Sequence, residues 1–201
     1  MGKKKVNANR IPVKWNEDDL YPEMEAITHD MVRLAWALVL SALGDRVDTT
    51  ADSLLAFWKT VNVSASKLST YEEIGSRLIM LDKRVGIMFP FRRISAANIR
   101  TKADLERLRR KLRENALHAM FALIADTIVE RNVMDDETLR WLFTKVRSRE
   151  EDIANKGLSE RDLLNVLEDE FSLLLREKDS DVVLEKITGV LRENGCTEAL
   201  D

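Results

Sequence analysis

The sequence predicts an all-α fold, a helical bundle of six or seven helices. Residues that break helices are scarce, with seven Gly and three Pro among 201 residues, whereas strong helix formers such as Leu, Ala, Glu and Lys are abundant. Apolar residues recur at helical spacing, and no run alternates convincingly with the period of a β-strand. We therefore expect no sheet.

Capping residues and glycines mark the expected ends of these helices. Ser, Thr, Asp and Asn side chains can accept hydrogen bonds from the free N–H groups at a helix start, and Gly44 and Gly195 can end helices. The first helix starts after Asn16 or near Tyr21, because Pro22 is tolerated only in a first turn. The later helices are expected to start at Thr50 or Asp52, Ser69 or Thr70, Thr101, Asp135 or Asp136, Ser159 and Ser180. The expected helices cover about 17–43, 51–66, 70–85, 101–131, 136–156, 159–178 and 180–195.

The chain also matches itself when it is shifted by 85 residues. Residues 16–62 then align with residues 101–147 without a gap, and identical pairs include Ala37/Ala122 and Leu54/Leu139. Capping positions and hydrophobic period are independent signals, and both repeat. We expect a duplicated three-helix unit around two central buried helices, because the long helix of each copy is apolar on nearly every side.

The repeat sets the expected domain organisation. Residues 1–14 form a basic flexible arm, and residues 15–85 form the first three-helix unit. Residues 86–100, around Pro90, connect it to a second helical unit, residues 101–201. The two units share one core, because neither central helix can be buried within its own copy alone.

Charge is strongly segregated along the chain. Residues 83–113 hold eleven Lys and Arg against two acids, a net charge of +9, although the whole chain carries −3. Leu105, Leu108 and Leu112 form a buried stripe, so the basic residues face water or a partner. A partner would be an acidic protein surface or a nucleic acid. The candidate binding residues are Lys83, Arg84, Arg92, Arg93, Arg100, Lys102, Arg107, Arg109, Arg110, Lys111 and Arg113.

Internal pairing is the alternative interpretation of this basic block. Acidic stretches at residues 150–152 and 168–170 on the outer helices could neutralise it, as happens in many charged runs. Within the block, Phe89 and Phe91 flank Pro90. We expect both rings to anchor the connecting segment in the core.

Candidate catalytic and metal-binding residues are few. Each histidine follows a glutamate by four residues, as Glu25/His29 and Glu114/His118, which places each pair on one helix face. Di-metal sites in bundles use a spacing of three together with further glutamates, so we interpret both pairs as helix-surface contacts. No Gly-x-Ser-x-Gly motif or phosphate-binding glycine loop is present. The sequence predicts no metal, no cofactor and no enzymatic activity.

Residues 70–89 resemble a DNA-binding helix-turn-helix. Ile79 and Leu81 stand where that motif needs a tight turn and a polar cap, so a continuous helix is expected instead.

The cellular location follows from cysteine usage and hydropathy. The lone Cys196 cannot form an internal disulfide, which favours a reducing compartment. Lys3 to Lys5 are followed by no apolar stretch of a signal peptide. The most apolar run, residues 31–43, has 13 residues, and a bilayer span needs about 20. We expect a cytoplasmic protein that does not enter a membrane.

Three sequence patterns together resemble those of small helical proteins of Gram-positive phages and mobile elements. They are the Asn/Thr-x-x-Asp-Leu helix start at Asn16 and Thr101, the Leu-x-x-x-Phe/Trp-x-x-Val pattern, and the Leu-Ser-x-x-Asp-Leu-Leu stretch at 158–164. The resemblance implies a setting and no catalytic residues. We expect a non-enzymatic binding or regulatory accessory protein that contacts a macromolecule through its basic central segment. The alternatives are a nucleic-acid-binding protein using residues 83–113 and a helical-bundle metal enzyme.

Overall fold

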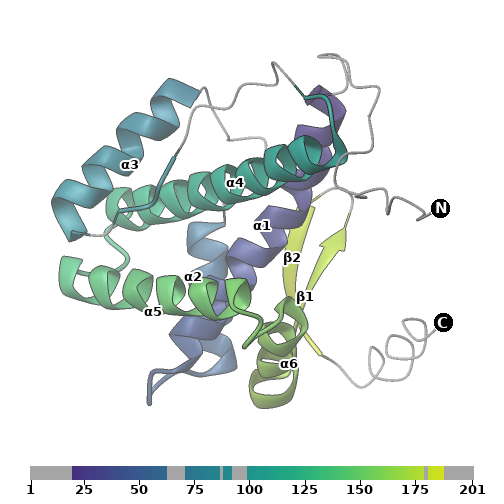
Figure 1. Ribbon diagram of the computed structural model, residues 1–201. Helices are drawn as coiled ribbons and strands as arrows, with labels where there is room; N and C mark the ends of the chain where they lie inside the picture. The colour runs from purple at the N-terminus through teal and green to yellow at the C-terminus, as the bar shows by residue number, and fades with distance from the viewer. Residues whose placement is uncertain (1–19, 63–70, 87, 92–98, 179–180, 188–201) are drawn as a thin grey trace.

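The computed structural model describes residues 20–62, 71–86, 88–91, 99–178 and 181–187. These residues form six helices and one two-stranded antiparallel sheet (Figure 1). The mainly helical architecture confirms the all-α class. The elements are α1 (Leu20–Gly44), α2 (Ala51–Val61), α3 (Tyr71–Val85), α4 (Lys102–Glu130), α5 (Asp136–Ala154), α6 (Glu160–Phe171), β1 (Leu173–Lys178) and β2 (Asp181–Lys186).

Local capping starts four of the helices where the sequence predicts it. Thr50, Thr101, Asp135 and Ser159 are the N-caps of α2, α4, α5 and α6. Each side chain accepts a hydrogen bond from the backbone N–H three residues later, which satisfies a donor that has no partner within the helix. The basic arm, residues 1–14, and the predicted caps Ser69 and Thr70 lie outside the described residues.

Capping also shifts the acidity of aspartates at three helix starts. The Thr101 hydroxyl donates to the Asp104 carboxylate at 2.7 Å and holds the pKa of Asp104 below its ordinary value. The Ser159 hydroxyl, 2.6 Å from Asp162, lowers the pKa of Asp162 in the same way. The backbone N–H of Thr138 is the main cause of the lowered pKa of Asp135.

We expect acid to weaken the fold through these caps. A carboxyl group with a lowered pKa in the folded state stabilises the fold above its unfolded pKa, here 3.8. That contribution is lost as the pH falls through the lower folded value. The melting temperature should therefore fall when the pH is lowered below about 4. It should fall less in an Asp104→Asn/Asp162→Asn variant. Circular dichroism melts at several pH values test this. Equal acid sensitivity of the variant and the wild type would contradict it.

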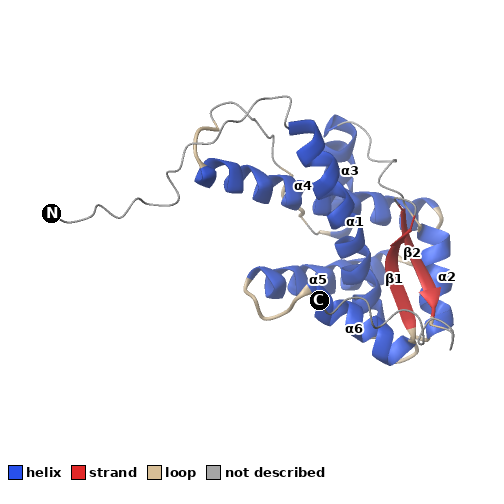
Figure 2. Cartoon of the chain, turned by 90° about the vertical axis from the view of Figure 1, so that its right-hand side faces the viewer, coloured by secondary structure: helices blue, strands red, loops and turns tan. Residues whose placement is uncertain are grey.

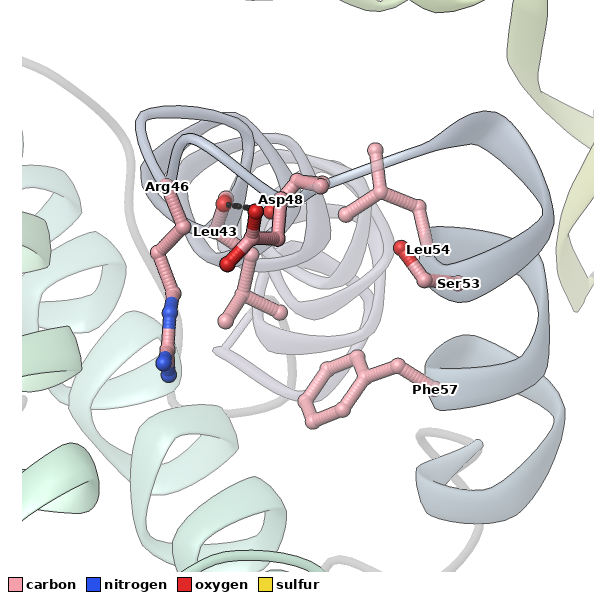
Figure 3. Close-up of a pocket in the computed structure, with 7 residues that line it drawn as sticks. Leu43, Arg46, Asp48, Ser53, Leu54 and Phe57 are labelled. Atoms are coloured by element: carbon pink, nitrogen blue, oxygen red, sulfur yellow. Dashed lines mark hydrogen bonds between the residues drawn. The ribbon is translucent and has the colours of Figure 1, made fainter.

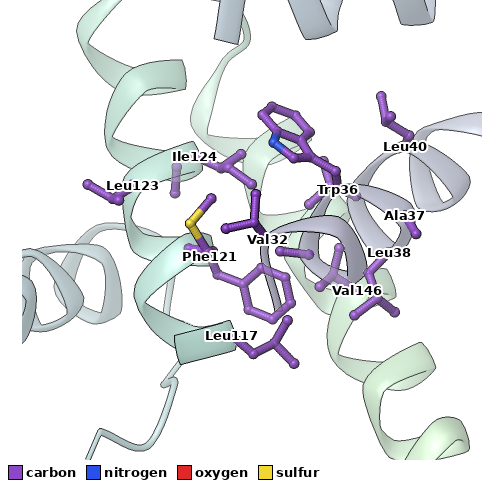
Figure 4. Packing of buried hydrophobic residues seen from close by; sticks show 14 of the residues in the cluster. Val32, Trp36, Ala37, Leu38, Leu40, Leu117, Phe121, Leu123, Ile124 and Val146 are labelled. Carbon is purple, nitrogen blue, oxygen red and sulfur yellow. The ribbon is translucent and has the colours of Figure 1, made fainter. Parts of the chain in front are cut away.

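The two long helices form the centre of a single core. α1 packs against α4, and Figure 4 shows side chains from both helices, including Trp36 and Phe121, in the space between them. Both rings are fully buried. Other positions 85 residues apart share this burial, as in the pairs Ala37/Ala122, Val39/Ile124, Leu54/Leu139 and Val61/Val146.

Contacts between the two halves are reciprocal, as expected for a duplicated unit. α3 of the first half packs on α4, and α6 of the second half packs on α1. The Arg46 guanidinium lies 5.7 Å from the ring centre of Trp141 in α5. Arg131, its equivalent after the 85-residue shift, donates a hydrogen bond to the Thr60 carbonyl in α2. Each half therefore depends on the other for burial.

The prediction of two helices after residue 159 is wrong beyond Phe171. α6 ends there because Ser172 adopts the left-handed conformation, with φ of 52°. β1 and β2 follow as an antiparallel hairpin, in which Leu175 pairs with Leu184. The second predicted helix, 180–195, is replaced by β2 up to Lys186, and residues 188–195 lie outside the described residues. The second unit is thus not purely helical.

Every second residue along the apolar part of each strand faces the core. Leu173, Leu175, Val182 and Leu184 are at most 5% exposed and cover the core on one face of the sheet. Val182 and Val183 are β-branched and favour extended backbone. Figure 2 shows the hairpin beside α2 and α6, so it closes one side of the helical core.

α1 is both long and apolar. Among the described helices, its segment Met24–Gly44 is the one that is long and apolar enough to cross a bilayer by length and composition alone. The segment is mostly buried in the fold, as a core helix of a water-soluble protein would also be. Its hydropathy therefore does not decide where the protein resides.

Candidate functional site

The basic block falls into separate parts in the structure. Lys83 and Arg84 lie at the end of α3, and Arg84 donates to the Asp136 carboxylate at 2.7 Å, at the start of α5. The other described cations lie from Arg100 to Arg113, at the opposite end of α4 from the start of α5. Arg113 and the last residue of α4, Glu130, are about 25 Å apart along the helix axis. Arg92 and Arg93 lie outside the described residues.

Most of the described cations of the basic block lie on the first three turns of α4. Leu108 and Leu112 are each 4% exposed and fix this stretch against the core, while Leu105 is partly buried. The cations on the remaining sides are exposed. We call these five residues the α4 basic surface: Lys102, Arg107, Arg110, Lys111 and Arg113. At 3.6 residues per turn they spread over about 180° of the helix circumference.

Most of this surface is not neutralised within the described residues. Arg107 lies 3.7 Å from Asp104, and an ion pair this long and solvent-exposed is weak. Glu106 pairs with Arg109 at 3.0 Å, so its charge is already matched. The remaining four cations have no ion-pair partner within the described ranges: Lys102, Arg110, Lys111 and Arg113.

Among the described residues, no ion pair joins the acidic stretches of α5 and α6 to the α4 basic surface. Glu151 pairs with Arg147 of its own helix at 3.1 Å, and Glu168 lies 4.0 Å from Arg161. Glu150 faces His118. Internal pairing with these stretches therefore does not account for the α4 basic surface in the described structure. Arg84, at the end of α3, does form an ion pair with another helix, through Asp136 of α5.

The connecting segment is anchored as the sequence predicts. Phe89 is 4% exposed and lies 5.2 Å from Phe121 and 5.6 Å from Phe143, measured between ring centres. Phe91 is partly buried against the same core. These contacts hold the segment between the carboxyl end of α3 and the amino end of α4. α3 itself is continuous, which confirms the expectation of a helix in place of a helix-turn-helix.

His118 is not the helix-surface partner of Glu114 that its spacing predicts. It is 3% exposed, with Nδ1 2.6 Å from the Pro90 carbonyl and Nε2 2.9 Å from the Glu150 carboxylate. A carbonyl can only accept, so Nδ1 donates to Pro90. Nε2 faces the Glu150 carboxylate. His118 thereby joins the connecting segment, α4 and α5.

The other candidate for a metal, His29, is partly exposed on α1. Within the described residues, no three His, Cys, Asp or Glu side chains come together in a group able to hold a metal ion. Cys196 lies outside those residues.

A shallow pocket opens where α1 turns into α2 (Figure 3). It has a volume of about 250 Å³, and its polar wall includes Arg46, Asp48 and Ser53. The Ser53 hydroxyl already donates to the Thr50 carbonyl at 2.8 Å and accepts from the Thr50 N–H at 2.9 Å. No histidine lines this pocket to act as a base beside that hydroxyl.

The α4 basic surface is therefore the feature that distinguishes this fold chemically. Its exposed cations lie on a rigid helix whose opposite side is locked into the core. Comparison with protein families, curated proteins and solved structures returns no match to the chain.

Proposed function

We propose that this protein is a non-enzymatic binding or regulatory protein that contacts an anionic macromolecule through the α4 basic surface. One observation carries the proposal: four exposed cations on three helical turns have no ion-pair partner among the described residues. Like charges held this close repel one another, and an external anion relieves that repulsion. A phage or mobile-element setting is what the sequence resemblance implies, and a cytoplasmic location is what the lone cysteine favours.

The rigidity of the surface supports a binding role. The backbone of α4 is fixed by its buried stripe and by the capping box of Thr101 and Asp104. The backbone that carries these Lys and Arg side chains is therefore ordered before a partner binds. This lowers the conformational entropy cost of association. The connecting segment is held beside it through His118 and Phe89.

We expect an Arg110→Glu/Arg113→Glu variant to lose its partner. Both side chains are exposed on the helix, so the fold and its melting temperature should change little, whereas affinity should fall about tenfold or more because two attractions become repulsions. Affinity capture from host lysate with immobilised wild-type protein and variant, followed by quantification of the retained protein and nucleic acid, measures this.

A Lys59→Glu/Lys145→Glu variant is the matched control. It changes the net charge by the same amount at exposed positions on α2 and α5. It should retain the partner as the wild type does. Equal retention by all three proteins would refute the proposed surface, and loss in both variants would assign the effect to net charge alone. An Arg92→Glu/Arg93→Glu variant separately tests the connecting segment.

A further inference from the structure

We infer that the anionic partner is double-stranded DNA, with the first turns of α4 lying along its major groove. This inference rests on the proposed function and names the partner class. The exposed cations flank the helix on both sides: Lys102 and Arg113 lie near one edge of the exposed arc, and Lys111 lies near the other. A helix in a groove needs this two-sided arrangement, since phosphates line both walls.

The dimensions of helix and groove agree. An α-helix with its side chains is about 10–12 Å wide, and the major groove of B-form DNA is about 12 Å wide. From Lys102 to Arg113 the helix rises about 16 Å, a length over which a duplex presents about ten phosphates. In Figure 2 the amino-terminal turns of α4 lie at an edge of the described fold.

The chemistry of the surface favours a phosphate backbone over an acidic protein. Protein interfaces draw their affinity from buried aromatic and apolar anchors. The large hydrophobic side chains exposed in the described structure lie elsewhere: Met24, Val47, Ile79, Met80 and Met88. The α4 basic surface offers cations without such anchors, which suffices for phosphate contacts but not for a stable protein interface.

The same observation favours a duplex over a single strand. Proteins that bind single strands stack the bases on exposed aromatic rings. No Phe or Trp whose side chain the structure describes is exposed; each is buried or partly buried. Duplex RNA fits less well, because its major groove is deep and too narrow for side chains to read. Binding should be largely independent of base sequence, since Arg and Lys contacts to phosphate carry no sequence information.

Fluorescence anisotropy with a labelled 24-base-pair DNA of mixed sequence tests the inference. The wild-type affinity should fall as salt rises, with a slope of about −0.9 in log–log form for each phosphate contact. An Arg110→Gln/Arg113→Gln variant should bind about tenfold or more weakly at 0.1 M salt, with the slope reduced by about 1.8. A Lys59→Gln/Lys145→Gln control should match the wild type. Circular dichroism confirms that each variant is folded.

Two further probes separate the failure of this inference from failure of the proposed function. Poly-glutamate represents an acidic polypeptide, and the unpaired strand of the same DNA represents a single strand. Tighter binding of either probe than of the duplex, lost in the Gln variant, overturns the DNA assignment and leaves the proposed surface standing. If no probe shows binding that depends on Arg110 and Arg113, both ideas fail.

Discussion

Replacing Trp36 by alanine should lower the free energy of unfolding by about 3–5 kcal/mol. The ring is fully buried on α1, in the shared centre of the two halves, and it meets the ring of Trp58 edge-on at 6.5 Å. Alanine removes the favourable transfer free energy of the buried ring. It also leaves a cavity that the four helices packed on α1 cannot fill by shifting. Urea denaturation followed by circular dichroism measures the loss.

Two controls show that burial and shape cause the effect. Val47 is fully exposed, so Val47→Ala should change stability by less than about 0.5 kcal/mol. Trp36→Phe should cost much less than Trp36→Ala, because the indole N–H has no hydrogen-bond acceptor in the described structure and most of the apolar ring is kept. A loss below 1 kcal/mol for Trp36→Ala would show that this position is not part of a packed core.

Local signals predicted most of the helical framework. Thr50, Thr101, Asp135 and Ser159 cap helices where the sequence places them, because capping depends on residues three positions apart. The burial of α1 and α4 also followed from sequence, since a helix that is apolar on all sides has to be covered on all sides. These features depend on local chemistry, and short segments carry enough information to predict them.

The hairpin was missed because its two segments are short and show no clear period. LLLREK and DVVLEK contain good helix formers such as Leu, Glu and Lys, and each is only six residues long. Leu174 and Val183 are also apolar, so neither segment shows apolar–polar alternation, and the β-branched pair Val182 and Val183 was the available signal for a strand. Packing against the core favours strands over helices here, because four apolar side chains on one face of the sheet become buried.

The partners of the candidate residues depend on contacts distant in sequence. Arg84 meets Asp136 across 52 residues, and His118 meets Glu150 across 32. Spacing along one helix suggested Glu114 for His118, but α4 turns that histidine inward toward Pro90 and α5. Separation of the basic block into an α3 end and an α4 surface likewise follows from helix packing, which charge counting along the sequence does not describe.

His118→Ala should destabilise the fold by about 3 kcal/mol. The substitution takes the imidazole away from the Glu150 carboxylate, which is 19% exposed and keeps the 3.6 Å contact with Arg147, and the Pro90 carbonyl loses its donor. It also removes a ring that lies 5.5 Å from Phe89, and so loosens the anchor of the connecting segment. Chemical denaturation measures the stability, and hydrogen exchange at the amide groups of residues 88, 89 and 91 measures the anchoring.

Two variants separate this buried contact from a general effect of losing a histidine. His29→Ala removes the partly exposed histidine and should change stability by less than about 0.5 kcal/mol. Glu150→Gln should cost less than His118→Ala, because the amide can donate to Nε2 while Nδ1 still donates to the Pro90 carbonyl, so each atom keeps a partner. If His118→Ala is as mild as His29→Ala, the histidine does not hold the connecting segment to α4 and α5.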